Sequence, residues 1–97
     1  MDKLVYEDNI EIKNADGLHM RPAMQFVDLA STFKSDIIIS KGDTPVDAKS
    51  IMQMTMLAAT CGTKLRIKAE GPDAQEALQA IKKLVEVEMF GEPPPKK

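Results

Sequence analysis

In Asn14-Ala15-Asp16-Gly17-Leu18-His19-Met20-Arg21-Pro22-Ala23, a turn of small and polar residues runs directly into the start of an expected helix. The first four residues have the composition of a tight turn, and the amphipathic run from Met24 to Phe33 predicts a helix. Gly17 permits a left-handed backbone before that helix. Pro22 suits the first turn, where the N–H that proline lacks would have no partner in any case. The stretch therefore predicts where the first helix begins.

The same stretch contains the single histidine of the chain, His19. A helix N-terminus combines unpartnered N–H groups with the positive end of the macrodipole, so it binds anions. Arg21 adds a planar guanidinium that suits phosphate oxygens. A neutral imidazole is a nucleophile near pH 7, and these donors would stabilise a phosphoryl group transferred to it. The alternative for a lone histidine is a helix cap or an ordinary surface residue.

Composition places the chain among small globular proteins and excludes several kinds of site. It has 97 residues, of which 43% are hydrophobic and 29% charged, and a net charge of −2 that disfavours binding to nucleic acid or to anionic membranes. With one cysteine, Cys61, there is no internal disulfide and no multi-cysteine metal site; we expect Cys61 to be a buried small hydrophobe. No cofactor or metal is expected, and no export signal or spanning segment is visible, so we expect a cytoplasmic protein.

Hydrophobic periodicity predicts an α+β fold in the order strand, helix, strand, strand, short helix, strand, helix. One four-stranded sheet with helices on one face would satisfy this order. The predicted strands are Ile10–Lys13, Asp36–Ser40, Thr44–Asp47 and Lys64–Ala69, the first of which could start earlier, within residues 1–8. The closing helix carries its apolar stripe at Ala77, Leu78, Ile81, Leu84 and Val85.

Individual residues mark several boundaries of these elements. Pro45 cannot donate to a ladder, so we expect its strand at the edge of the sheet. Ser50, with Gln53 three residues later, predicts a capping box at the start of the short helix, and Asp73 predicts the N-cap of the closing helix. Gly91 is expected to end that helix. We expect one domain over residues 1–91 and a disordered Pro/Lys tail over 92–97.

Two motifs resemble those of a known family. Gly17-Leu18-His19-Met20-Arg21-Pro22-Ala23 is similar to the active-site signature of HPr, the histidine phosphocarrier of the bacterial phosphoenolpyruvate–sugar phosphotransferase system, and Lys49-Ser50-Ile51-Met52 is similar to the second HPr signature. The resemblance implies a βαββαβα fold whose antiparallel sheet has strand order 1-4-2-3, with three helices on one face. It also implies a monomer that is a stoichiometric carrier and not an enzyme.

The resemblance assigns roles to residues at matching positions. His19 would accept the phosphoryl group on Nδ1 from phospho-enzyme I and pass it to EIIA-type proteins for sugar uptake, with Arg21 stabilising the group and Gly17 and Pro22 shaping the backbone. Ser50 would be either a structural N-cap or a regulatory site for an HPr kinase/phosphorylase. The positions that would dock these partners are Met20, Met24, Ile51, Met52, Gln53 and Thr55.

Part of this methionine-rich region has a second interpretation. Met54, Met56 and Leu57 lie at spacings that also suit burial in a core. Two further functions also remain open from the sequence. One is a regulatory HPr paralogue, for example of a nitrogen-related branch, whose phosphorylation state is read by binding partners. The other is an α/β module that holds an anion at the helix entrance without chemistry.

Overall fold

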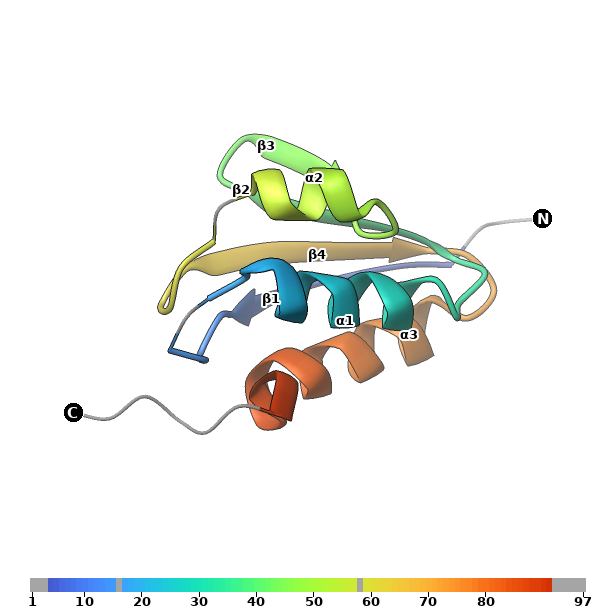
Figure 1. Cartoon of the computed structure of the whole chain (residues 1–97). Helices are drawn as coiled ribbons and strands as arrows, with labels where there is room; N and C mark the ends of the chain where they lie inside the picture. The colour runs from blue at the N-terminus through green and yellow to red at the C-terminus, as the bar shows by residue number, and fades with distance from the viewer. Residues whose placement is uncertain (1–3, 16, 58, 92–97) are drawn as a thin grey trace.

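The computed structural model describes residues 4–15, 17–57 and 59–91, and within them three α-helices cover one face of a four-stranded sheet (Figure 1). The sheet order is β1-β4-β2-β3 and every neighbouring pair is antiparallel, which confirms the implied topology. The strands are β1 (Val5–Glu11), β2 (Asp36–Lys41), β3 (Thr44–Asp47) and β4 (Lys64–Glu70). The helices are α1 (Met20–Ala30), α2 (Ile51–Met56) and α3 (Ala74–Lys82), followed by a π-helical turn (Lys83–Val87) and a 3₁₀ turn (Met89–Gly91).

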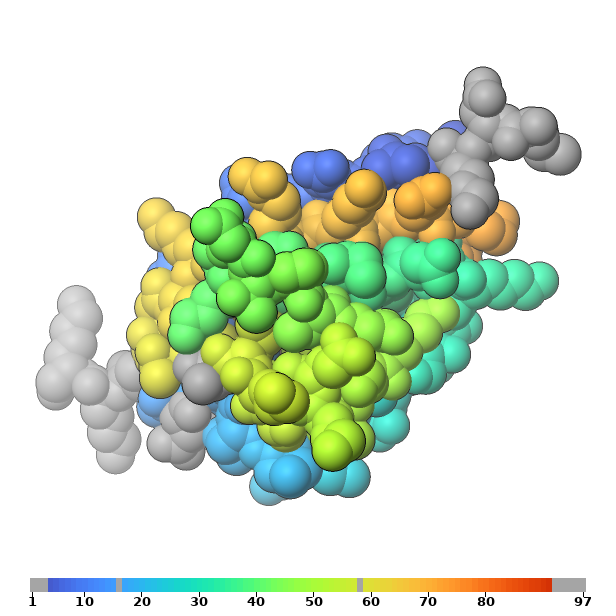
Figure 2. All heavy atoms as spheres, turned by 90° about the horizontal axis from the view of Figure 1, so that it is seen from above, coloured from blue at the N-terminus to red at the C-terminus, as the bar shows by residue number. Residues whose placement is uncertain are grey.

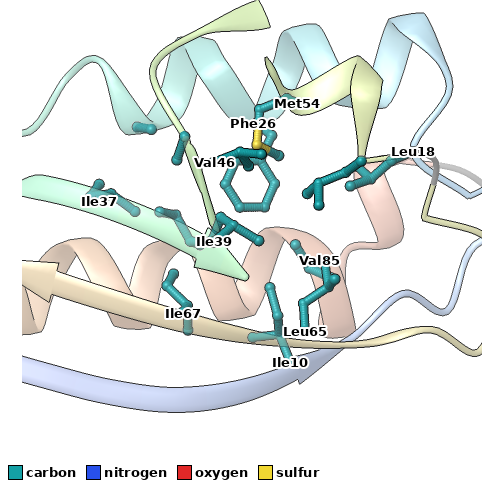
Figure 3. Packing of buried hydrophobic residues seen from close by; sticks show 14 of the residues in the cluster. Ile10, Leu18, Phe26, Ile37, Ile39, Val46, Met54, Leu65, Ile67 and Val85 are labelled. Carbon is teal, nitrogen blue, oxygen red and sulfur yellow. The ribbon is translucent and has the colours of Figure 1, made fainter. Parts of the chain in front are cut away.

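Alternation along the strands separates a core face from a solvent face. In β4, Leu65, Ile67 and Ala69 are buried while the residues between them are exposed, as expected for a sheet covered on one side. The inward residues of β1, β2 and β4 meet Phe26 of α1 and Met54 of α2 in one cluster (Figure 3). Burial of this shared apolar surface fixes the helices on the sheet.

The ends of several elements differ from the prediction. Strand β1 starts at Val5 and ends at Glu11, because it pairs along its whole length with β4, from Val5 opposite Glu70 to Glu11 opposite Lys64. The closing helix is regular only to Lys82 and then widens into the π-helical turn. The edge position predicted from Pro45 is confirmed, since β3 lies at the edge of the sheet.

Some predictions concern residues outside the described ranges. The proposed tail over residues 92–97 and Asp16 of the predicted turn both lie there. Among the residues that the structure does describe, no helix is long and apolar enough to cross a membrane.

Asp73 is the N-cap residue of α3, but its side chain makes no capping hydrogen bond, so the predicted cap is wrong in this respect. Its carboxylate instead accepts hydrogen bonds from the Ser35 hydroxyl and from the backbone N–H groups of Lys34 and Ser35. These donors, the Ser35 hydroxyl first, lower the pKa of Asp73 from 3.8 to about 2. The residue therefore fixes the α1–β2 connection and not its own helix.

We expect Asp73 to make the free energy of unfolding depend on acid pH. A carboxyl whose pKa is lower in the folded state contributes stability that is fully present above the unfolded pKa of 3.8 and is lost as pH falls through the folded value of about 2. Urea unfolding at a series of pH values should therefore show the Asp73→Asn variant losing less stability than the parent chain between these limits. The exposed turn variant Asp43→Asn is the control; an equal change in both variants would contradict the assignment.

Candidate functional site

The loop that leads into α1 is held from behind by the segment that follows α2. The N–H of Leu18 donates to the carbonyl oxygen of Ala59 at 2.8 Å. Gly17 has φ +68°, and a Cβ built on it would lie 2.5 Å from the Ala59 oxygen and 2.8 Å from the Cα of Thr60. The predicted backbone-shaping role of Gly17 thus has two causes, its left-handed conformation and the lack of space for a side chain.

Asn14 is a structural residue of this loop, although its sequence context indicates only a turn. It is fully buried, and its Nδ2 donates to the carbonyl oxygen of Gly17 at 2.7 Å. The Gly17 N–H in turn donates to the Asn14 carbonyl oxygen at 3.2 Å. Asparagine is favoured in turns because its side chain can bond nearby backbone groups, so an asparagine shortly before Gly17 was the available signal.

His19 is the N-cap residue of α1, with φ −75° and ψ −174°, and it is exposed. Its carbonyl oxygen accepts the first hydrogen bond of the helix, from the Ala23 N–H at 3.0 Å, while its side chain makes no capping bond. The N–H groups of Met20 and Arg21 precede that first bond, and Pro22 has none, so no intrahelical acceptor is available to them. The structure thus places His19 and Arg21 together at the anion-binding end of α1.

Pro22, predicted to shape the backbone, and Arg21, predicted to stabilise the phosphoryl group, both lie in the first turn of α1. Pro22 is fully buried in the first turn of α1, while Arg21 is exposed on that same turn. The proline ring therefore anchors the helix start to the core and leaves the guanidinium in solvent, where it can meet an incoming anion.

Ser50 is half of the predicted capping box. Its hydroxyl oxygen accepts the Gln53 N–H at 3.3 Å at the start of α2. The second bond of the predicted box, from the Ser50 N–H to the Gln53 side chain, is wrong. The Gln53 side-chain oxygen accepts the N–H of Asp47 at 2.8 Å instead. Gln53 therefore ties α2 to the end of β3, and Ser50 alone caps the helix.

Ser50 and His19 lie at opposite ends of α1, because α1 and α2 run antiparallel (Figure 1). The Lys49 ammonium donates to the carbonyl oxygen of Phe33 at 2.9 Å, just beyond the end of α1. The segment after α2 contacts the other end through Leu18 and Ala59. Since α1 has 11 residues, about 16 Å of helix separates the two ends.

Exposed apolar side chains gather on α1 and α2. Of the predicted docking positions, Met20 is 58% exposed, Met24 50%, Ile51 36% and Met52 73%. Gln53 is also exposed, and Thr55 is half-buried with its hydroxyl donating to the Met52 carbonyl oxygen. Figure 2 shows yellow-green α2 bordering the light-blue start of α1 on one face of the molecule. We call the five exposed apolar residues on these helices the methionine patch: Met20, Met24, Ile51, Met52 and Met56.

Two expectations for neighbouring residues are corrected. Met54 and Leu57 are buried as their spacing suggested, but Met56 is 78% exposed, because a residue two positions from Met54 points to the opposite side of the helix, as Met52 also does. Cys61 is exposed and not a buried hydrophobe. It lies in the turn before β4, where its Sγ is 3.6 Å from the carbonyl oxygen of Lys13.

The comparisons with known proteins agree with this geometry. The family model described as the PTS HPr component phosphorylation site matches residues 6–87. The phosphocarrier protein HPr of Neisseria meningitidis is 42% identical over 79 residues, which is 81% of this chain and 89% of the relative. The HPr-like protein Crh of Bacillus subtilis is 39% identical over 83 residues, 86% of this chain and 98% of the relative.

A solved structure shows the same fold. HPr-C-His from Thermoanaerobacter tengcongensis superposes with a TM-score of 0.87 at 45% identity, and the match covers 91% of this chain and 98% of that one. Similarity of this extent in both sequence and structure goes beyond shared architecture, because it includes the segment that contains the helix entrance.

Proposed function

The chain belongs to the HPr family of phosphocarriers of the phosphotransferase system, and from this premise we propose that His19 is the residue that carries the phosphoryl group. The observation that carries this proposal is the position of His19. It is an exposed N-cap residue directly before two N–H groups that precede the first intrahelical hydrogen bond. It is also the only histidine in the chain.

The proposed transfer uses few groups. Nδ1 of neutral His19 attacks phosphorus, a P–N bond forms as the bond between phosphorus and its donor breaks, and the donor leaves with the electron pair of that bond. The N–H groups of Met20 and Arg21 and the Arg21 guanidinium stabilise the negative charge on the phosphoryl oxygens. Transfer onward is the same step in reverse toward the acceptor. The carrier is regenerated stoichiometrically and does not turn over by itself.

Intact-mass measurement after incubation with phosphoenolpyruvate and enzyme I tests the proposal. We expect one phosphoryl adduct per chain that is lost in acid, since phosphohistidine is acid-labile. An acid-stable adduct would contradict a histidine carrier, and the absence of any adduct would favour the anion-binding module.

Membership of the family implies that the partners are proteins of the phosphotransferase system. Among these, we propose enzyme I as the phosphoryl donor and EIIA-type proteins as the acceptors. The methionine patch supports this proposal because it borders the start of α1, where His19 lies (Figure 2). Methionine side chains adapt to several partners, and a carrier needs small interfaces that form and separate quickly. With such partners, we propose that the carrier is a cytoplasmic protein with one domain over residues 1–91.

Charge introduced into the methionine patch should weaken docking without unfolding the chain. Met52 and Met56 are 73% and 78% exposed, so Met52→Glu/Met56→Glu should leave the urea midpoint nearly unchanged. Losing two apolar contacts of an interface should raise the KM for phosphoryl transfer from enzyme I about tenfold or more. Leu4→Glu/Val87→Glu is the matched control, since Leu4 and Val87 are 51% and 70% exposed but lie outside the patch. An equal effect of the control would show that charge alone, and not the patch, matters.

Ser50 is a proposed second site, phosphorylated by an HPr kinase/phosphorylase. It is partly exposed, and its hydroxyl oxygen already accepts a helix N–H, so a phosphate there would keep acceptor oxygens facing the same donor. Incubation with such a kinase and ATP should give an acid-stable adduct that is absent in Ser50→Ala. If parent and variant gave the same adduct, Ser50 would be only a cap.

A regulatory role is the second candidate function, in which the phosphorylation state is read by binding partners and no sugar is moved. The similarity to a solved structure described as Crh, the Bacillus subtilis catabolite repression HPr, favours considering it. Pull-down with both phosphorylated and unphosphorylated chain distinguishes the two. A partner that binds only one state and accepts no phosphoryl group would support regulation.

A further inference from the structure

The sheet has two edges, β1 and β3, and they differ in length and composition. Strand β3 has four residues and includes Pro45, so it offers little backbone to another chain. Strand β1 has seven residues and no proline. An edge strand of this length is a template for pairing with an added strand.

Two outward N–H groups of β1, at residues 9 and 11, are already bonded to carboxylates of the same chain. The N–H of Asn9 donates to Oδ1 of Asp8 at 2.7 Å, and the N–H of Glu11 donates to Oε2 of Glu86 at 2.9 Å. In an antiparallel ladder alternate residues direct their backbone groups to the same side, so both donors belong to the outer edge, away from β4. An incoming strand would have to displace both carboxylates.

Both carboxylates are held in place by the C-terminal helical segment. The Lys82 ammonium contacts Oδ2 of Asp8 at 2.9 Å, and this hydrogen bond lowers the pKa of Asp8, which keeps it a charged acceptor. Glu86 lies in the π-helical turn, where the N–H of Glu88 donates to the carbonyl oxygen of Lys83 at 2.9 Å, five residues back. A π-helical turn shifts the side chains that follow it relative to a regular helix, and here it accompanies the contact of Glu86 with β1.

We propose that Asp8 and Glu86 are edge caps that prevent β1 from pairing with β1 of a second copy of this chain. A second copy is the favoured occupant because two antiparallel β1 strands related by a two-fold axis present the same donors and acceptors to each other. The two carboxylates occupy the outward N–H groups of residues 9 and 11, so these groups cannot donate to a second β1 strand. This role is independent of phosphoryl transfer, and it would keep a carrier monomeric while its patch exchanges partners.

Removing both caps tests the proposal. Asp8→Ala/Glu86→Ala should associate at millimolar concentration, with the mass from sedimentation equilibrium rising toward twice that of the monomer. At low concentration, where the variant is monomeric, the Asn9 and Glu11 amides should exchange hydrogen about tenfold faster than in the parent chain. The matched control is Glu7→Ala/Glu76→Ala, which removes the same charge from exposed residues of β1 and α3.

Two further variants locate the effect. Lys82→Met removes the ion pair that holds Asp8 but leaves the Glu86 cap, so it should associate more weakly than the capless variant. Adding Asn9→Pro to the capless variant removes an outward donor without breaking the ladder to β4 and should restore the monomer. The proposal is overturned if the capless variant stays monomeric with unchanged amide exchange. It is also overturned if the control pair associates equally, or if the proline variant still dimerises; Glu86→Ala alone serves as the test should the double variant fail to fold.

Discussion

The His19→Ala variant is expected to take up no phosphoryl group from phosphoenolpyruvate and enzyme I. No other histidine exists in the chain, and loss of a nucleophile lowers a group-transfer rate by about 10³-fold or more. The fold should be retained, because His19 is exposed. Its free energy of unfolding should therefore change by less than ~0.5 kcal/mol. Intact mass and urea unfolding measure both quantities on the same sample.

Arg21→Met is the companion variant for this prediction. It keeps the nucleophile and the helix but removes the guanidinium, so the same acid-labile adduct should form about 10²-fold more slowly. An acid-labile adduct on His19→Ala would move the phosphoryl site elsewhere. A rate for Arg21→Met equal to that of the parent chain would remove Arg21 from the site and leave the N–H groups of the helix start as the stabilising donors.

The Gly17→Ala variant should lose more stability than His19→Ala, about 3 kcal/mol in the free energy of unfolding. A left-handed residue with a side chain costs ~1–2 kcal/mol, and the added Cβ would also lie 2.5 Å from the Ala59 oxygen and 2.8 Å from the Thr60 Cα. Both neighbours are backbone atoms, so relief requires the loop to move away from the segment after α2. That movement would displace His19 from the helix entrance and slow phosphoryl transfer as well.

Gly42 offers a matched control for the steric part. It also has a positive φ, +59°, but no atom lies within 4 Å of a Cβ built on it. Gly42→Ala should therefore cost only the conformational term, ~1–2 kcal/mol, and leave transfer unchanged. Urea unfolding of the two variants isolates the contact with Ala59 as their difference. Equal losses would show that the contact relaxes without cost.

The local sequence pattern was sufficient to predict the strands and helices and the start of α1. Alternation in residues 64–69 and helical spacing in residues 23–30 match β4 and α1, because burial on one side imposes those periods directly on the chain. The His19 position was predictable for the same reason, since a turn glycine and a first-turn proline specify where a helix starts. The strand order came from the resemblance to HPr, because periodicity does not state which strands are neighbours.

Side-chain partners could not be predicted in the same way. Asp73 bonds the Ser35 segment and not its own helix, and Gln53 bonds Asp47 and not Ser50. In both cases the acceptor is of the expected type at the expected helix start, but folding brings a different donor within reach. Cys61 and Met56 are exposed for a related reason, since burial depends on which segments lie opposite a residue.

By itself the sequence therefore determined the strands and helices, the start of the helix that carries His19, and the family to which the chain belongs. Only the tertiary structure decided that the backbone of Ala59 supports the His19 loop, that Ser50 lies at the far end of α1, and that carboxylates cover the edge of β1. The physical reason is distance along the chain. Periodicity and capping act between residues a few positions apart, whereas these contacts join segments up to 75 residues apart that meet only when the core is packed.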